Sequence, residues 1–281
     1  MLHRQPTVSV IVPTKDVSRT IERCLSSIRG QSWQALELIV IDNFSKDGTW
    51  EIAEGIADVA LQAGPERSSQ RNLGISLAKG QYILWIDADM VLTPRVVEDA
   101  VLAAEREEAT AVFIPEVTVG TGFLTACRAL ERRCYVGVEL IEAPRLIRRS
   151  FFDDHVGFVE ELSGQEDAEL RMRLLEDRAR MVHIDTYILH DEGHLTLGQV
   201  LRKRYYYGQF LPTYNRQQPG AIGAQGSATL KAMAKGLPIL AEQPVHAVAL
   251  IALRGAEAAA YSFGAARALW SQRTGELGRT G

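Results

Sequence analysis

The chain has 281 residues, of which 46% are hydrophobic and 23% charged, so it has the length and composition of a globular protein with a sizeable core. Its net charge of −4 argues against a nucleic-acid-binding protein that relies on a basic surface. Three cysteines lack metal-ligand spacing and predict small core residues of a reduced protein: Cys24, Cys127 and Cys134. Residues 1–6 contain no apolar segment, so we expect no signal peptide and a cytoplasmic location.

The first part of the chain alternates apolar runs with amphipathic segments. Strands are predicted at residues 8–12, 36–41, 58–62 and 82–86, and helices at 16–29, from 47, from 66 to 79, and around an apolar stripe at 96–104. This spacing predicts an α/β fold with a doubly wound, mostly parallel sheet. The sequence has neither a Gly-x-Gly-x-x-Gly turn after its first strand nor a P-loop, which excludes a dinucleotide-binding fingerprint and a P-loop NTPase.

The alternation becomes less regular after a further predicted strand at 111–115. We expect helices at 120–138 and 167–177, a loop at 151–162, and a strand over 187–190. From residue 217 the chain is rich in alanine and glycine, and charged residues interrupt the apolar stretch 244–270, so a membrane-spanning segment is not expected. We therefore predict a domain at residues 1–215 that carries the sheet, and a helical C-terminal extension at 216–281.

Two carboxylates end the most apolar predicted strand. Asp87 and Asp89, separated by Ala88, follow the continuous apolar run 82–86, which suits a strand covered on both faces. In an open α/β sheet, ligands bind at the carboxyl ends of the strands. Carboxylates there suit Mg²⁺ or Mn²⁺ with substrate phosphates completing the coordination, so the sequence indicates a nucleoside diphosphate site. The alternative is an Asx turn that ends the strand.

Several segments resemble the motifs of family 2 glycosyltransferases, which are inverting enzymes with the GT-A fold. They are residues 8–14 (Val-Ser-Val-Ile-Val-Pro-Thr), 41–49 (Ile-Asp-Asn-Phe-Ser-Lys-Asp-Gly-Thr), 71–74 (Arg-Asn-Leu-Gly), 87–89 (Asp-Ala-Asp) and 164–167 (Gly-Gln-Glu-Asp). The resemblance covers residues 6–215. It implies a metal-dependent, hexosyltransferase-type enzyme (EC 2.4) that transfers a sugar from a nucleoside diphosphate, UDP foremost, to a hydroxyl acceptor.

The resemblance also assigns roles to individual residues. Nucleotide binding falls to Pro13, Thr14, Asp42, Arg71, Asp87 and Ala88, and metal binding to Asp89, Asp87 and His190. Asp42 would accept a hydrogen bond from the uracil N3 imide, or instead cap the helix that begins near residue 47. The family usually has Asp-Asp-Gly-Ser here, whereas this chain has Asp-Asn-Phe-Ser at 42–45. Arg71 would lie near the diphosphate, or be a solvated arginine on a helix. His190 would complete the metal site, or be structural.

Inversion requires one base, which removes the proton of the acceptor hydroxyl. Asp167, at the start of the predicted helix 167–177, is the candidate, and the adjacent Glu166 is the second choice. The alternative is an acidic first turn that the helix dipole stabilises. The departing diphosphate needs no protein acid, because a divalent cation neutralises its charge.

A basic and aromatic segment at 199–208 contains further candidates. Arg202, Lys203 and Tyr205 would contact the diphosphate or an anionic lipid headgroup, or form a solvated basic face. An amphipathic helix in the tail would lie on a membrane or pack against a partner subunit. A lipid-linked acceptor, a cell-envelope or secondary-metabolite glycan, and peripheral contact with the inner face of the membrane are therefore among the expectations. Rival functions are a nucleotidyltransferase of related fold and a non-catalytic sugar-nucleotide-binding protein.

Overall fold

The structure is a computed structural model and describes residues 6–274. Its contacts divide the described residues into two compact units. The sheet unit contains residues 6–117, 142–160 and 173–191, and the helical unit contains residues 118–141, 161–172 and 192–274. Because the chain passes between the units several times, neither unit is a continuous segment. The domain boundary at residue 215 stays a prediction.

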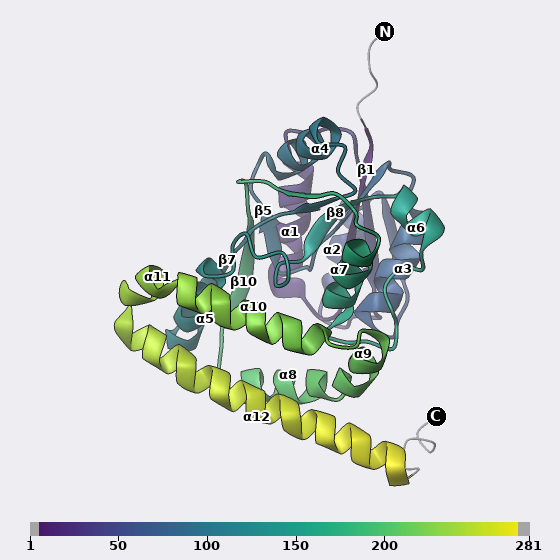
Figure 1. The fold of residues 1–281 in the computed structure, drawn as a ribbon. Coiled ribbons are helices and arrows are strands. Elements are labelled where there is room, and N and C mark those ends of the chain that lie inside the picture. Colours follow the sequence, from purple (N-terminus) through teal and green to yellow (C-terminus); the bar gives the residue numbers. More distant parts are fainter. Residues whose placement is uncertain (1–5, 275–281) are drawn as a thin grey trace. The chain divides into compact units, whose positions relative to one another are not determined.

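A seven-stranded sheet forms the centre of the sheet unit, with strand order β3-β2-β1-β4-β8-β6-β9 (Figure 1). Strands β1 to β4 run parallel, β8 is antiparallel to both β4 and β6, and β9 is parallel to β6. The predicted mostly parallel sheet is therefore confirmed, although β8 was not predicted. The strands are β1 (Val8–Thr14), β2 (Leu36–Asp42), β3 (Val59–Gln62), β4 (Tyr82–Trp85), β6 (Ala111–Phe113), β8 (Pro144–Arg148) and β9 (Met181–His183).

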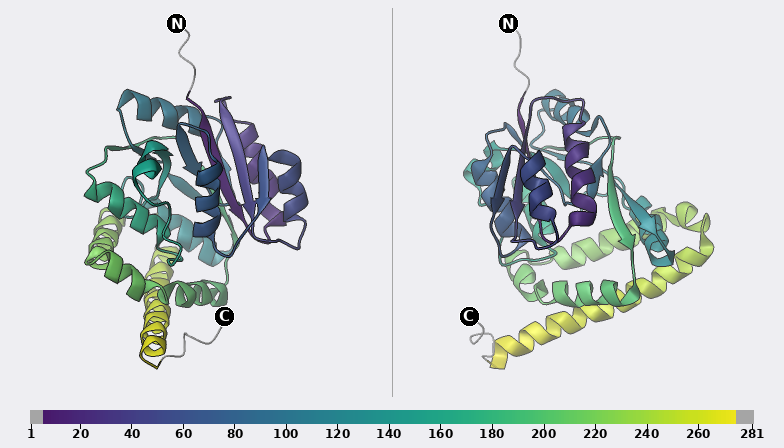
Figure 2. Two further views of the ribbon diagram at one scale, coloured as in Figure 1. Left: turned by 90° about the vertical axis from the view of Figure 1, so that its right-hand side faces the viewer. Right: turned by 180° about the vertical axis from the view of Figure 1, so that it is seen from behind.

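Helices cover both faces of this sheet (Figure 2). Successive side chains of a strand point to opposite faces, so Val10 of β1 packs in a core with Leu25, whereas Ile11 packs with Leu73. Gly74 allows the second helix layer to lie close, because a Cβ there would be 2.5 Å from Cγ2 of Ile11. The helices of this unit are α1 (Ser18–Arg29), α2 (Thr49–Ile56), α3 (Arg67–Leu77), α4 (Val96–Arg106) and α6 (Ser150–Asp154).

The loop predicted at 151–162 is wrong at its start, where α6 forms. A five-residue helix is too short to produce a recognisable apolar period, and burial of Phe151 holds it in place.

A second, three-stranded sheet has the order β5-β10-β7, with β5 at Met90–Leu92, β7 at Glu116–Thr121 and β10 at Ile188–His194. Strand β10 runs antiparallel to β5 and places His190 opposite Met90. The backbone N–H of Asp191 donates to the carbonyl of Asp89 at 2.8 Å. The strand predicted over 187–190 is confirmed, and its pairing brings His190 next to the acid pair.

The helical unit contains α5 (Phe123–Arg133), α8 (Leu197–Gly208), α9 (Leu211–Gln217), α10 (Ala221–Lys235), α11 (Leu237–Ala241) and α12 (Pro244–Thr274). Helix α7 (Glu166–Glu176) begins in this unit and ends in the sheet unit. Helix α12 packs along α8 and also contacts α5 (Figure 1). Gly264 makes the α8–α12 crossing possible, because a Cβ there would lie 2.1 Å from the carbonyl oxygen of Tyr205.

Two charged residues of α12, Arg254 and Glu257, pair with residues of neighbouring helices. Glu257, only 3% exposed, accepts hydrogen bonds from Arg128 of α5 at 2.5 Å and Arg204 of α8 at 2.9 Å. Arg254 forms ion pairs with Glu257 and Glu131. Burial alone would raise the pKa of Glu257, but the arginines outweigh it and lower the pKa to about 2. Within residues 6–274, no helix combines the length and apolarity needed to cross a bilayer.

Candidate active site at the carboxyl edge of the sheet

The predicted site residues of the strands gather at one edge of the sheet. Asp87 follows β4; the parallel strand next to it, β1, ends at Thr14, and the next parallel strand, β2, ends at Asp42. These are the carboxyl ends of adjacent strands, the usual position of ligands in an open α/β sheet. The sequence-predicted convergence of Thr14, Asp42 and the acid pair is therefore present in the structure.

Asp87 is held by a buried arginine. Nη2 of Arg71 donates to Oδ1 of Asp87 at 2.7 Å, and the Arg71 guanidinium lies 4.3 Å from the Trp85 ring centroid. The Arg71 side chain is 0% exposed, so the alternative of a solvated surface arginine is wrong. Burial alone would raise the pKa of Asp87, but Arg71 and Arg145 outweigh it and hold the pKa below its ordinary value.

Arg145 of β8 is a second buried arginine beside Asp87, and it was not predicted from the sequence. Its Nη1 lies 3.9 Å from Oδ2 of Asp87, and its Nη2 and Nε donate to Oε1 of Glu116 at 2.5 and 3.0 Å. Its guanidinium lies 4.1 Å from the Trp85 ring centroid. The available signal was an arginine within the short apolar run 144–147, but nothing local indicates its partners.

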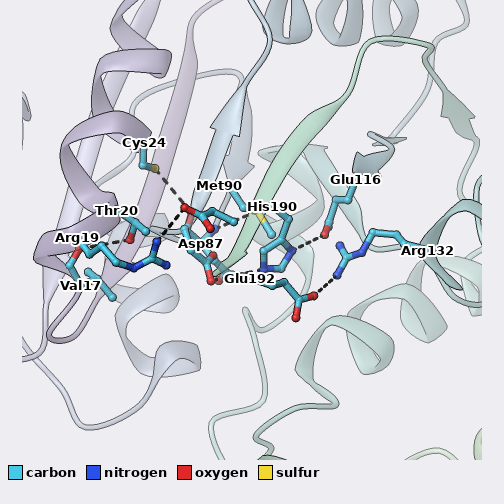
Figure 3. Close-up of polar contacts among 12 residues, drawn as sticks. Val17, Arg19, Thr20, Cys24, Asp87, Met90, Glu116, Arg132, His190 and Glu192 are labelled. Atoms are coloured by element: carbon cyan, nitrogen blue, oxygen red, sulfur yellow. Dashed lines mark hydrogen bonds and ion pairs between the residues drawn. The ribbon is translucent and has the colours of Figure 1, made fainter. Parts of the chain in front are cut away.

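His190 lies beside Glu116 (Figure 3) and also close to Asp89, the second acid of the pair. Nδ1 of His190 lies 2.9 Å from Oε2 of Glu116, and Nε2 lies 3.5 Å from Oδ2 of Asp89. A carboxylate at one ring nitrogen fixes the orientation of the other, as around metal-bound histidines. Oδ1 of Asp89 is buried and has no hydrogen-bond partner among residues 6–274. Since a buried acceptor without a donor is costly, this oxygen fits an external ligand or cation.

Asp89 and His190 therefore fit the expected Mg²⁺ or Mn²⁺ site. Asp87 differs from Asp89 because Arg71 and Arg145 already compensate its charge. Among residues 6–274, no three His, Cys, Asp or Glu side chains form a group that could hold a metal ion. Two protein ligands suit a cation that fills its other positions with water and substrate phosphates.

Asp42 is completely buried, and its carboxylate already accepts hydrogen bonds within the protein. Oδ1 accepts from the hydroxyls of Thr14 at 2.9 Å and Ser45 at 2.5 Å; Oδ2 accepts from the Ser45 N–H at 2.9 Å and the Gln62 amide at 3.2 Å. The Ser45 bonds form an Asx-type turn at the end of β2. A uracil imide would have to replace one of these donors, and the base contact stays a prediction. Pro13 and Ala88 are also buried at this edge.

Asp191 links α1 to the strand that carries His190. Arg19 donates to Oδ2 of Asp191 at 3.0 Å, and Arg23 pairs with the same oxygen. Both arginine side chains are more than half exposed, whereas the Asp191 side chain is 11% exposed. These cations next to the acid pair were not predicted, because α1 and β10 are far apart in the sequence.

In the helical unit, Glu166 and Asp167 form the first turn of α7. Glu166 is buried and Asp167 is half-buried, and Asp167 interacts electrostatically with Arg171 one turn later. Gly164, just before them, has a φ of +81°, and a Cβ there would lie 2.4 Å from the Tyr207 ring. Their position agrees with a dipole-stabilised acidic turn, and their catalytic roles stay predictions.

Arg202, Lys203 and Tyr205 are exposed on α8. Nζ of Lys203 lies 5.8 Å from the Tyr207 ring centroid. Thr196 and Gln199 form a capping box that starts this helix, which accounts for the position of both polar residues. Contacts of the three exposed side chains with diphosphate or lipid stay predictions.

The fold is similar to solved glycosyltransferase structures. The mannosyltransferase PcManGT of Pyrobaculum calidifontis, in complex with GDP-Man and Mn²⁺, aligns over 96% of this chain and 88% of its own, with a TM-score of 0.64 and 20% identity. S. aureus TarS 1-349, in complex with UDP, aligns over 96% and 92% of the two chains with a TM-score of 0.53 and 18% identity. Such identities show the fold alone, and the predicted GT-A fold with a helical C-terminal region is confirmed.

Sequence relatives point the same way. The uncharacterized glycosyltransferase EpsJ of Bacillus subtilis is 33% identical over 150 residues, which are 51% of this chain and 41% of EpsJ. The succinoglycan biosynthesis protein ExoO of Rhizobium meliloti is 24% identical over 206 residues, 71% of this chain and 57% of ExoO. The chain thus spans less than two thirds of the length of these relatives. The sequence model described as glycosyl transferase family 2 matches residues 9–154, which contain β1 to β4 and the acid pair. Since this match covers more than half of the chain, the protein belongs to glycosyl transferase family 2.

Proposed function

We propose that this protein is a metal-dependent, inverting glycosyltransferase that moves a sugar from a nucleoside diphosphate sugar, UDP-sugar foremost, to a hydroxyl acceptor. The observation that carries the proposal is the buried Oδ1 of Asp89. In the part of the chain that the structure describes, no residue donates to this oxygen, which lies on the side chain that faces His190. The structural neighbours in complex with GDP-Man and Mn²⁺ or with UDP support a nucleotide sugar as the donor.

The residues of the sheet unit bind the donor in this proposal. Asp89 and His190 would hold the cation, and Glu116 would orient His190 through its Nδ1. The cation supplies positive charge that neutralises the departing diphosphate. Asp87, kept anionic by Arg71 and Arg145, accepts a hydrogen bond from a ribose hydroxyl or from water on the metal.

Asp167 acts as the base, with Glu166 as the second candidate. Its carboxylate takes the proton of the acceptor hydroxyl while that oxygen attacks the anomeric carbon on the face opposite the diphosphate. The bond between the anomeric carbon and the diphosphate oxygen breaks, and the configuration inverts. No carboxylic acid is required on the leaving side, unlike in glycoside hydrolysis.

The acceptor in this proposal is a lipid-linked hydroxyl of a cell-envelope glycan, and the enzyme acts in the cytoplasm at the inner face of the membrane. Arg202, Lys203 and Tyr205 support it, because exposed cations and an aromatic ring suit anionic headgroups at a membrane interface.

Substituting Asp89 tests the donor site. Thermal unfolding should be measured with UDP, GDP, dTDP and CDP sugars, with and without Mn²⁺. A nucleotide sugar at one hundred times its Kd stabilises the fold by about 2.7 kcal/mol. Asp89→Asn should remove the Mn²⁺-dependent part of this stabilisation together with turnover, whereas Asp185→Asn, an exposed acid of the same unit, should retain both. An undiminished Mn²⁺-dependent shift in Asp89→Asn would contradict the proposal.

Substituting Asp167 tests catalysis separately from binding. Asp167→Asn should reduce turnover by roughly 10²-fold to 10⁴-fold and leave nucleotide-sugar stabilisation intact. A non-catalytic binding protein would show stabilisation and no turnover in the wild type. A nucleotidyltransferase would instead release pyrophosphate from a nucleoside triphosphate.

A further inference from the structure

Helix α12 presents an apolar face to solvent along its length. Its large exposed side chains are each at least 47% exposed and recur near helical spacing: Val245, Val248, Ile251, Phe263, Leu269 and Trp270. Exposed small residues, including Ala252 and Ala259, fill the positions between them. We call this set of exposed residues the α12 face. The opposite side of the helix, with Leu250 and Leu253, is buried within the helical unit.

No exposed acid lies on the α12 face. Between residues 193 and 274 the only acids are Glu242 and Glu257; Glu242 pairs with Arg133 at 2.8 Å, and Glu257 is buried. The same range contains nine lysines and arginines, so it has a net charge of +7, although the whole chain has a net charge of −4. Arg267 and Arg273 are exposed near the C-terminal end of α12. Arg267 lies 5.0 Å from the Trp270 ring centroid.

We propose that the α12 face binds the surface of an anionic lipid bilayer. Its apolar side chains enter the boundary between headgroups and acyl chains, Trp270 lies at the interface, and the arginines contact anionic headgroups. A second copy of this chain is a poorer occupant. Two α12 faces brought together would juxtapose two regions of the same net positive charge, whereas an anionic bilayer carries the opposite charge.

This inference deepens the proposed function, on which its connection to a lipid-linked acceptor rests. The lipid-binding surface itself depends only on α12 and its charges. Lipid binding and nucleotide-sugar binding can therefore be measured independently. Asp89→Asn should lose Mn²⁺-dependent stabilisation and retain vesicle binding.

Co-sedimentation of the full chain with lipid vesicles tests the proposal. Binding to vesicles of phosphatidylcholine and phosphatidylglycerol at a 3:1 ratio should exceed binding to pure phosphatidylcholine by at least about tenfold, and should weaken as salt screens the charges. The double variant Phe263→Ser/Trp270→Ser should bind anionic vesicles at least about tenfold more weakly. Val156→Ser, which alters a side chain 73% exposed in the sheet unit, should bind like the wild type.

Three results would overturn the proposal. One is a wild type that does not sediment with anionic vesicles, and another is a double variant that binds them as well as the wild type does. The third is a wild type that is a dimer and a double variant that is a monomer, as measured by light scattering after size exclusion. The α12 face would then be an interface between copies. All variants should show wild-type thermal unfolding in the absence of lipid, since the altered side chains are exposed.

Discussion

Replacing Arg145 with methionine should lower the free energy of unfolding by about 3–5 kcal/mol, the usual cost of removing one partner of a buried ion pair. Arg145 is 4% exposed, and both of its hydrogen bonds to Glu116 would be lost. Methionine retains an unbranched stem against Trp85, so the loss is mainly electrostatic. Glu116, whose side chain is 13% exposed, would retain its contact with His190.

The same substitution should change the pH dependence of stability through Asp87. The pKa of Asp87 is lowered in the folded protein. Its contribution to the free energy of unfolding is therefore present above the unfolded pKa of about 3.9 and is lost as the pH falls through the folded pKa. Without Arg145 the pKa of Asp87 rises towards its ordinary value. The variant should therefore lose less stability than the wild type between about pH 4 and pH 2.

Urea unfolding followed by circular dichroism at pH 7 and at several acidic pH values measures both effects. Arg148→Met is the matched control on the same strand, because its side chain is 33% exposed and its ion pair with Glu105 is correspondingly weaker. Arg148→Met should lower the free energy of unfolding by less than half as much as Arg145→Met does. The double variant Glu116→Gln/Arg145→Met should lose less free energy of unfolding than the sum of the losses in the two single variants. An Arg145→Met protein within about 1 kcal/mol of the wild type would refute the assignment of this buried pair.

Three further outcomes are expected. Gly264→Leu should lower the melting temperature and loosen α12, since its Cβ would meet the Tyr205 carbonyl at 2.1 Å, while Gly255→Ala on the open side of the same helix should be neutral or stabilising by up to about 1 kcal/mol. The stabilising contribution of Glu257 is fully present above its ordinary pKa of 4.5 and is lost as the pH falls towards about 2. Glu257→Gln should therefore lower the free energy of unfolding, measured with urea, by less in acid than at neutral pH. A maleimide should label no cysteine of the native protein and three after unfolding, because all three thiols are buried and burial raises their pKa values: Cys24, Cys127 and Cys134.

The parallel half of the fold could be predicted because its signals are local. Continuous apolar runs mark β1, β2 and β4, and each run ends at a polar residue that the parallel arrangement places at the same edge. Asp42, Asp87 and Thr14 follow from that rule alone.

The contacts that define the site depend on strand pairing between distant segments. β8 inserts antiparallel beside β4 and brings Arg145 to Asp87, and β10 pairs with β5 and brings His190 to Asp89. Neither pairing leaves a periodic signal in the sequence. The partners of the charged residues in α12 could not be predicted for a similar reason. Arg254 and Glu257 interrupt an apolar pattern in the sequence. In the fold, Glu257 is buried and pairs with residues of α5 and α8, and the half-buried Arg254 pairs with Glu131 of α5.

The two acids of the Asp-Ala-Asp motif differ because the fold gives them different neighbours. Asp87 receives a hydrogen bond from one buried arginine and lies within 3.9 Å of another, so its negative charge is compensated before any ligand arrives. Asp89 has a histidine at 3.5 Å and one buried oxygen without a protein donor, so it retains capacity for an external cation or donor. A doubled acid without compensation would hold two repelling charges within one turn and would raise the pKa of one of them. Compensation by Arg71 and Arg145 therefore lowers the pKa of Asp87 and fixes this carboxylate in position, while Asp89 is available for binding.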